Sequence, residues 1–302
     1  MNSNPEQPPV IDYEGSDYQT SFWDEGGREY EDQSERIALK RLLLDQGNLL
    51  LEIGAGAGRN TSRYSGYQRV VLLDYSLTQL QAAQEHLGRC DRFIYVAGDV
   101  YRLPFVENLF EGATMIRTLH HMKDPLASMR QIQRVLKPES PFILEYANKQ
   151  NLKAILRYLF GRQEWSPFSL EAVEFTELNF DFHPNSIRKW LTDAGFKLER
   201  QLTVSHFRIN VLKKWIPTRV LVFLDSIFQL TGVWWQLSPS VFTRSQTTKT
   251  TSPGTVTGFF QCPACRDDFS DADQEKDQLL CPSCGVSYPI IDGIYDFRDL
   301  GS

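Results

Sequence analysis

The sequence predicts an α/β protein in which a doubly wound, mostly parallel sheet is followed by a small cysteine-bound module. Short apolar runs alternate with helical stretches along the chain, the pattern of a parallel sheet covered on both faces. A glycine-rich turn, GAGAG at 54–58, directly follows the first apolar run. Four of the five cysteines cluster near the C-terminus. Together these features predict one large domain and one small one.

Seven strands and the helices between them account for most of the chain. The strand candidates are 48–53, 69–74, 92–99, 112–118, 141–147, 197–204 and 238–247. The helix candidates are 34–45 with Ser34 as its cap, 77–87, 124–136, 148–163, 183–196 and an aromatic-rich insertion at about 211–235. We therefore expect an acidic N-terminal segment or lid at 1–33, the main domain at 34–248, a linker at 249–258 and the small module at 259–302.

The charge of the chain is unevenly distributed. Its net charge is −6, yet residues 1–33 alone hold nine acidic residues against one arginine, so the rest is nearly neutral. A neutral body carries no general electrostatic signal for nucleic acid. The first twenty residues lack a signal-peptide pattern, and the most apolar window, 220–235, is too short to span a bilayer. We expect a cytoplasmic protein and leave open a peripheral contact with a membrane.

The glycine turn favours a cationic cofactor over a phosphate. A P-loop needs Lys and Ser or Thr after its last glycine, but Arg59 and Asn60 follow Gly58. A dinucleotide fingerprint would need glycine at 59. Glu52 lies two residues before the first glycine, where a carboxylate would repel a pyrophosphate. S-adenosylmethionine carries a sulfonium and an ammonium and no phosphate, so it suits this position.

Two further acidic residues end the next two strands. Asp74 is placed to hold both hydroxyls of a ribose, and Asp99 to accept from an adenine amino group. Ligands of open α/β sheets bind outside the carboxyl ends of the strands, where these three acids gather. The alternative, that the glycines serve only helix packing, leaves the three acids unexplained.

Five motifs in order, EIGAGAGRN, LLDYS, GDVYRLPF, IRTLHHM and RVLKPESPFILEYANK, resemble class I S-adenosylmethionine-dependent methyltransferases. The resemblance covers roughly residues 34–205 and is nearest to the ubiquinone and menaquinone biosynthesis branch. It implies a Rossmann-like fold in which Glu52, Gly54 and Gly56 line the methionine and ribose side. It also implies that Asp74 binds ribose, that Tyr75 packs on adenine, and that Asp99 and Val100 hold the adenine edge. Ala55 and Arg117 complete the expected cofactor-binding set.

The catalytic residues stay unassigned from the sequence. Positioning the acceptor in line with an activated methyl group asks little of side chains, although a poorly acidic acceptor needs a base. Arg117, His120 and His121 end the fourth strand beside the expected methyl group. Both histidines are substrate-side candidates, with the alternative that they cap or pack the following helix.

The cysteine cluster predicts structural zinc. Cys262, Cys265, Cys281 and Cys284 follow C-x2-C-x15-C-x2-C, which supplies a complete tetrahedral shell. With 288–290 (YPI) and 292–294 (DGI), the module resembles zinc-ribbon proteins that activate methyltransferases acting on tRNA, rRNA and release factors. Here it is fused to the enzyme. By analogy it docks on the main domain as a scaffold, which the sequence alone does not show.

The acceptor is bound by elements outside the sheet in this fold. We expect aromatic side chains of the N-terminal segment, among them the substrate-side candidate Trp23, to form a roof over an apolar acceptor together with apolar side chains of the insertion. The alternative is that these side chains complete the core. The side chains concerned are Tyr18, Phe22, Trp23, Tyr30, Trp215, Phe223, Ile227, Leu230, Trp234 and Trp235.

The helix candidate at 148–163 carries a second pattern. Lys149, Lys153 and Arg157 repeat every four residues along it and form a cationic stripe. Such a stripe is a solvated face, or it meets a phosphate, an anionic membrane or RNA.

Three functions follow. The first is methylation of a small-molecule or lipid-like acceptor. The second is methylation of RNA or protein with the ribbon as a platform, and the third a non-catalytic cofactor-binding scaffold. The acceptor atom and the oligomeric state are not determined by the sequence.

Overall fold

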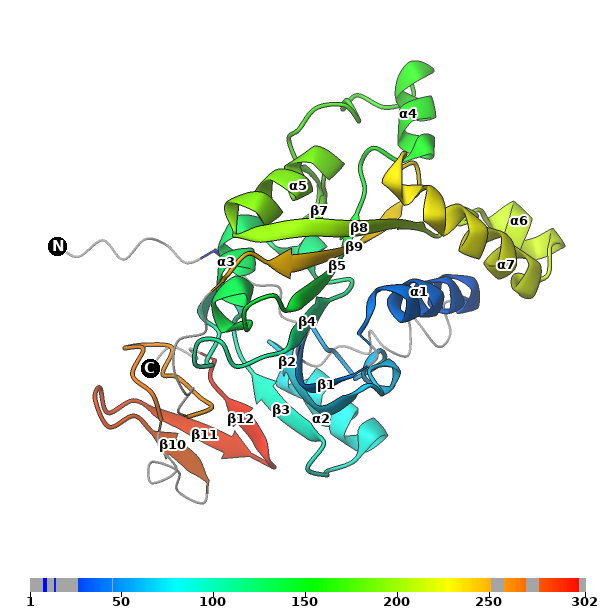
Figure 1. Cartoon of the computed structure of the whole chain (residues 1–302). Helices are drawn as coiled ribbons and strands as arrows, with labels where there is room; N and C mark the ends of the chain where they lie inside the picture. The colour runs from blue at the N-terminus through cyan, green and yellow to red at the C-terminus, as the bar shows by residue number, and fades with distance from the viewer. Residues whose placement is uncertain are drawn as a thin grey trace.

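A single sheet of ten strands runs through the molecule (Figure 1). The computed structural model describes residues 8, 9, 14, 27–44, 46–250, 258–269 and 277–298. Within these residues the strand order is β10-β11-β12-β3-β2-β1-β4-β5-β9-β8. The strands are β1 (Gly47–Ile53), β2 (Tyr67–Asp74), β3 (Phe93–Ala97), β4 (Gly112–Met115), β5 (Pro141–Ala147), β8 (Phe196–Val204), β9 (Ser240–Thr247), β10 (Gln278–Leu280), β11 (Ser287–Ile291) and β12 (Ile294–Asp296).

Seven of these strands form the sheet that the sequence predicts. Strands β3, β2, β1, β4 and β5 pair in parallel, β9 is antiparallel to β5, and β8 is antiparallel to β9. Alternate residues of β2 face opposite layers: Val70 and Leu72 belong to the cluster containing α2, and Val71 and Leu73 to the cluster containing α3 and α5. The doubly wound α/β fold is confirmed. Apolar runs buried on both faces explain why these strands were predictable.

Apart from the helix expected at 148–163, the helices lie close to their expected positions, with one exception. They are α1 (Glu29–Leu42), α2 (Leu77–Leu87), α3 (Pro125–Val135), α4 (Leu152–Leu159), α5 (Pro184–Asp193), α6 (Asn210–Trp215) and α7 (Thr218–Phe228), with 3-10 turns η2 (Thr61–Arg63), η3 (Val100–Arg102), η4 (Leu119–His121) and η5 (Gln229–Val233). The exception is α1. It starts five residues before Ser34, which is buried inside the helix and caps nothing. Acidic residues Glu29, Glu31 and Asp32 in its first turn stabilise the earlier start.

The expected helix at 148–163 is shorter, and its cationic stripe is wrong at one position. Asn151 caps α4 by accepting from the amide of Ala154, so Lys149 precedes the helix. The Lys149 side chain is buried, and its Nζ donates to Ser169 Oγ at 2.9 Å and to the Glu171 carbonyl. Only Lys153 and Arg157 remain on the exposed helix.

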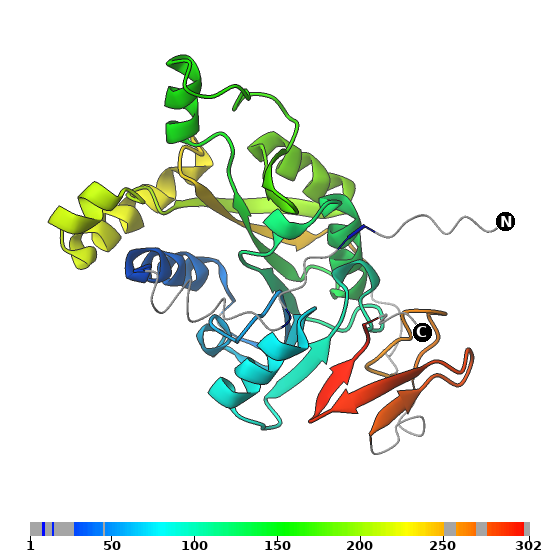
Figure 2. The same cartoon turned by 180° about the vertical axis from the view of Figure 1, so that it is seen from behind.

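The C-terminal module continues the main sheet. Strand β12 pairs in parallel with β3, with Ile294 opposite Tyr95 and Asp296 opposite Ala97. Phe260 stacks on Phe105 with ring centroids 5.9 Å apart, and one hydrophobic cluster spans both parts. Figures 1 and 2 show β10, β11 and β12 lying beside β3. The docking that the resemblance implied is therefore present in the structure.

The insertion and a short hairpin lie outside the sheet. The insertion consists of α6, α7 and η5, and α7 packs along α1 through Tyr30 and Asp225. The hairpin, β6 (Val173–Thr176) and β7 (Asn179–Asp181), has no counterpart among the predicted elements. Among the helices that the structure describes, none is long and apolar enough to cross a membrane.

Candidate functional site

The glycine turn after β1 adopts a backbone shape that needs glycine. Gly54, Gly56 and Gly58 have φ of 67°, 53° and 78°, the left-handed region that other residues rarely enter. A Cβ on Gly54 would lie 2.1 Å from Thr118 Oγ1, and one on Gly58 would lie 2.7 Å from Leu87 Cδ1. A Cβ on Gly56 would meet nothing closer than 3.9 Å. Gly54 and Gly58 therefore serve close packing, and the main chain at Gly56 stays open to a ligand.

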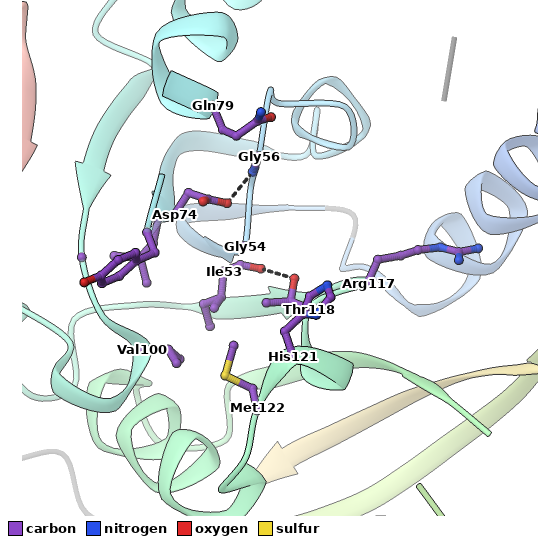
Figure 3. Close-up of a pocket in the computed structure, with 13 residues that line it drawn as sticks. Ile53, Gly54, Gly56, Asp74, Gln79, Val100, Arg117, Thr118, His121 and Met122 are labelled. Atoms are coloured by element: carbon purple, nitrogen blue, oxygen red, sulfur yellow. Dashed lines mark hydrogen bonds between the residues drawn. The ribbon is translucent and has the colours of Figure 1, made fainter. Parts of the chain in front are cut away.

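An open cavity lies beside this turn (Figure 3). It lies where β1, β2, β3 and β4 end, which is the edge expected for a ligand in an open parallel sheet. Its lining residues are Ile53, Gly54, Gly56, Leu73, Asp74, Tyr75, Gln79, Gly98, Val100, Arg117, Thr118, His121 and Met122.

Asp74 joins the glycine turn to the end of β2. The amide of Gly56 donates to Asp74 Oδ2 at 2.8 Å, and the amide of Ser76 donates to Oδ1 at 3.0 Å. Ser76 also caps α2, so the helix start and the carboxylate are held together. Tyr75 follows Asp74 in the cavity wall, and Val100 lines the wall from the end of β3. This part of the expected cofactor set is gathered around one cavity.

Three members of the expected set lie outside the cavity lining. Glu52 is buried, and its Oε2 accepts from Thr61 Oγ1 at 2.6 Å. Burial raises the Glu52 pKa to about 7, against the opposing effect of the Thr61 hydrogen bond. Asp99 accepts from the amide of Tyr101 at 2.8 Å and caps η3. Ala55 is buried behind the turn. These residues shape the cavity from behind.

Arg117 lines the cavity in a backbone conformation unusual for its type. Its φ is 59°, and its amide donates to Glu145 Oε2 at 3.0 Å. Its guanidinium forms an ion pair with Glu35 on α1, and Glu35 also binds Arg59 at 2.9 Å. Burial raises the pKa of Glu145, while Arg117 lowers it and Glu35 raises it further. Strained residues of this kind gather at functional sites.

The rings of the two histidines at the end of the fourth strand pack together, with centroids 3.9 Å apart. His121 lines the cavity, and its Nδ1 lies 3.0 Å from the Leu178 carbonyl. Because a carbonyl only accepts, Nδ1 carries the proton and Nε2 is the basic nitrogen. Burial lowers the pKa of both histidines, and for His120 the neighbouring His121 and Arg117 lower it further. Of the two, only His121 is placed to reach a bound molecule.

The sequence did not single out several cavity residues. Gln79 on α2, Thr118 after β4 and Met122 after η4 all line it. Thr118 donates to the Ile53 carbonyl at 3.4 Å and packs on Gly54. Their types are common, and the only signal for Thr118 and Met122 was their place in the motif IRTLHHM. Trp23, Tyr18 and Phe22 lie outside the described residues.

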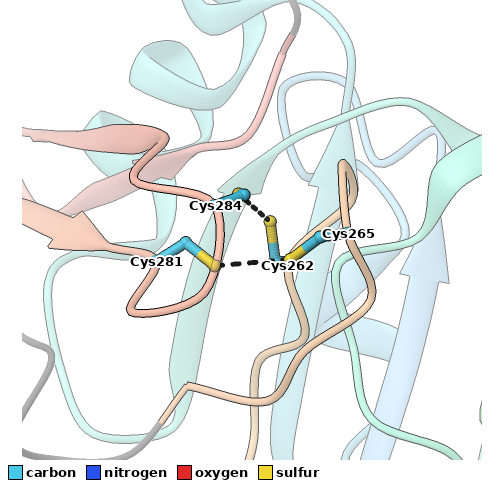
Figure 4. Close-up of side chains that lie close together, drawn as sticks. All are labelled: Cys262, Cys265, Cys281 and Cys284. Carbon is cyan, nitrogen blue, oxygen red and sulfur yellow. Dashed lines mark hydrogen bonds between the residues drawn. The ribbon is translucent and has the colours of Figure 1, made fainter.

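The four clustered cysteines come together at the base of the C-terminal module (Figure 4). Their sulfurs lie within 4.8 Å of one another, with Cys262 and Cys284 at 3.7 Å and Cys265 and Cys281 at 3.5 Å. A tetrahedral ion with bonds of about 2.3 Å to sulfur separates its ligands by roughly 3.8 Å. Tyr288 lies 3.3 Å from the Cys262 sulfur. The donor set and spacing fit a tetrahedral metal ion.

Two parts of the chain match known protein families. A family described as methyltransferase domain matches residues 51–144, the stretch that holds the glycine turn and the cavity. These residues are a methyltransferase domain. The family of Trm112p-like proteins matches residues 257–293, which include the four cysteines. The chain therefore joins a methyltransferase domain to a Trm112p-like domain.

Two curated relatives of the methyltransferase domain have names that refer to menaquinone or ubiquinone. A demethylmenaquinone methyltransferase of Corynebacterium kroppenstedtii is 37% identical over 33% of this chain and 42% of that protein. A ubiquinone/menaquinone biosynthesis C-methyltransferase UbiE of Pseudomonas syringae is 29% identical over 54% of this chain and 70% of that protein. The chain thus spans less than half of the first relative.

Two solved structures share the fold over most of the chain. One is from a complex between the Haloferax volcanii Trm112 methyltransferase activator and a putative methyltransferase; it gives a TM-score of 0.55 at 17% identity, covering 77% of this chain and 96% of that chain. Another is a putative S-adenosylmethionine-dependent methyltransferase of Listeria monocytogenes, with a TM-score of 0.54 at 14% identity, covering 73% and 99%. At such identities the likeness concerns the fold alone.

Proposed function

We propose that the chain transfers a methyl group from S-adenosylmethionine to a small-molecule or lipid-like acceptor. The observation that supports it best is the hydrogen bond from the Gly56 amide to the Asp74 carboxylate, because both residues line the cavity. A carboxylate accepts at about four positions, which suits Asp74 to hold ribose hydroxyls together with the two amides. The open main chain at Gly56 gives the cofactor a close approach.

The remaining cavity residues would then divide the cofactor between them. Tyr75 and Val100 would flank the adenine, and Gly54 with Thr118 would border the methionine side. When bound, S-adenosylmethionine supplies an activated methyl group. Glu52 and Asp99 would act from behind the wall by holding Thr61 and η3 in place.

His121 is the best-placed group to accept a proton from the acceptor. Its Nδ1 is fixed on the Leu178 carbonyl, and its lowered pKa keeps the ring neutral at neutral pH. If it accepts a proton, the rate should fall only below about pH 6.5, and His121→Asn should remove that limb. His183, whose Nδ1 caps α5, offers a control outside the cavity.

Structural zinc is proposed for the four cysteines. Their closed tetrahedral arrangement leaves no position for a reacting water, so the metal would hold the fold of the Trm112p-like domain. That domain pairs its β12 with β3, which supports a scaffolding role.

The proposal of a small-molecule or lipid-like acceptor rests on the names of two relatives and on the exposed apolar side chains of the insertion. Two relatives carry quinone names, and quinones are apolar small molecules. Methylation of RNA or protein is the second candidate, favoured by the likeness to a Trm112 complex with a methyltransferase. A non-catalytic scaffold is the third. We place the activity in the cytoplasm.

Incubation with methyl-labelled S-adenosylmethionine and cell extract tests the proposal. Lipid, small-molecule, RNA and protein fractions are separated and counted, with Asp74→Asn as the inactive control. Label in the lipid or small-molecule fraction that depends on Asp74 supports the proposal. Label in RNA or protein would instead support the second candidate, methylation of RNA or protein. Cofactor binding without any label would support the third, a non-catalytic scaffold.

A further inference from the structure

The helices outside the sheet expose apolar side chains that a soluble fold normally covers. We call the exposed apolar side chains of α4, α6, α7 and η5, with Trp234 and Trp235, the apolar rim. Trp215, Trp234 and Trp235 are 78%, 76% and 69% exposed. Monomeric proteins rarely expose a contiguous apolar patch of this kind unless it meets a partner or a membrane.

Two helices of the apolar rim turn their apolar stripe outward. Leu152, Leu156 and Leu159 follow one face of α4, and all three are exposed. On α7, Phe223 and Ile227 are exposed, while the opposite face packs on α1 through Leu221, Val222 and Asp225. An amphipathic helix normally buries its apolar stripe against the core. The aromatic residues of the insertion therefore do not complete the core, and none of them lines the described cavity.

The apolar rim lies at the same edge of the sheet as the cavity. Strand β5 ends at Ala147 and leads into α4, and β8, which runs in the same direction, ends at Val204 and leads into α6. The amide of Leu152 donates to the Leu237 carbonyl at 2.8 Å, which joins α4 to the end of the insertion. Figures 1 and 2 show α4 and the α6–α7 pair projecting beyond the sheet.

Basic side chains accompany the apolar rim. Lys153 and Arg157 lie on α4, and Lys214 and Arg219 on α6 and α7, all of them exposed. Within the described part of the chain, none of the four is in an ion pair, whereas Lys213 is paired with Glu31. The acid of the insertion, Asp225, is buried on Tyr30 and His206. Four exposed glutamates follow at 164–177, on a segment that contacts α4 through Phe168 and Tyr158 and lies away from α6 and α7 (Figure 1).

We propose that the apolar rim docks on the surface of an anionic lipid bilayer. Tryptophan side chains favour the interface between lipid and water, and lysine and arginine beside them favour anionic headgroups. A symmetric contact with a second copy would bring the four cations against the same four cations, which is repulsive. Nucleic-acid interfaces are more polar than this surface.

The inference stands apart from the proposed reaction, because vesicle binding is measured without cofactor or acceptor. Docking of the apolar rim would also place the cavity where it can reach an acceptor dissolved in the bilayer. Failure of methyl transfer would leave the docking intact, and failure of docking would leave the reaction with a water-soluble acceptor.

Co-sedimentation of the full zinc-loaded chain with lipid vesicles tests the proposal. Vesicles of phosphatidylcholine alone are compared with vesicles that also contain phosphatidylglycerol. We expect at least about tenfold stronger partitioning onto the anionic vesicles, because each lysine or arginine near such a surface contributes about fivefold. High salt should weaken it.

Two variants and two matched controls assign the effect to the apolar rim. Trp234→Ser with Trp235→Ser, and Lys153→Glu with Arg157→Glu, should each reduce partitioning at least about tenfold. Leu280→Ser changes an apolar side chain that is 41% exposed on the Trm112p-like domain, and Lys197→Glu changes an exposed lysine at the opposite end of β8. Both controls should bind as the parent does. Unchanged thermal unfolding shows that each variant is folded.

Absence of binding to both vesicles would overturn the proposal, as would equal losses in the controls. A dimer in sedimentation equilibrium that dissociates on Trp234→Ser with Trp235→Ser would assign the apolar rim to a second copy and overturn it as well.

Discussion

Arg117 and Glu35 connect the cavity to the first helix across 82 residues of sequence. Arg117 Nε donates to Glu35 Oε1 at 2.7 Å, and Nη2 donates to the same oxygen. Burial raises the pKa of Glu35, but Arg117 and Arg59 together lower it below its usual value. The carboxylate therefore stays ionised and holds Arg117 in the cavity wall.

Glu35→Gln should destabilise the chain by about 3 kcal/mol, because it removes the counter-ion of the largely buried Arg117, while Arg59 keeps its ion pair with Asp32. Urea unfolding at pH 7 measures the change. Glu111→Gln removes a partly exposed pair with Lys137 and should cost less than about 1 kcal/mol. Equal costs for the two variants would show that Glu35 is no more important than a surface acid.

Gly54→Ala should destabilise the chain by at least about 2 kcal/mol, since its Cβ would overlap Thr118 at a positive φ. Gly88→Ala is the matched control: its φ is 84°, and a Cβ there would meet nothing within 4 Å. The control therefore reports backbone strain alone. Thermal unfolding of both variants measures the difference, and a Gly54→Ala cost no larger than that of the control would contradict the close packing.

Glu52→Gln should flatten the pH dependence of stability. The folded pKa of Glu52, about 7, lies above its ordinary value of 4.5, so the folded state binds the proton more tightly. Its contribution is complete below about pH 4.5 and is lost as pH rises through 7, by up to about 3 kcal/mol. Urea unfolding from pH 5 to 8 should show a smaller loss in Glu52→Gln than in the parent. An identical loss in both would contradict the buried acid.

Removing the metal should undo the extension of the sheet. We expect about one zinc ion per chain by atomic absorption, and a fall in Tm of roughly 5 °C or more after chelation or in Cys265→Ser. Loss of the Trm112p-like domain exposes Phe105 and the edge of β3, so binding of an apolar dye should rise. A chain without zinc that keeps its Tm would contradict the structural role.

The seven strands of the methyltransferase domain were predictable, because each is an apolar run buried on both faces. The docking of β12 on β3 was not, since parallel pairing uses backbone groups that leave no side-chain pattern. The placement of Lys149 was wrong because its four-residue spacing from Lys153 suggested one helix. Asn151, which caps α4, was the signal against it.

The cavity was predicted in part. Gly54, Gly56, Asp74 and Arg117 are motif residues and line it. Gln79 belongs to no motif, because it reaches the cavity only through the packing of α2 against the sheet. The expected contact of Glu52 with the ligand stays a prediction; in the structure its carboxylate accepts from Thr61 Oγ1.

Calorimetric titration of S-adenosylmethionine into the parent chain and Asp74→Asn is the most direct test of cofactor binding in the cavity. We expect one saturable site in the parent and at least about tenfold weaker binding in Asp74→Asn, with the fold of the variant intact by circular dichroism. Absence of binding in the parent, or equal affinity in the two proteins, would contradict it.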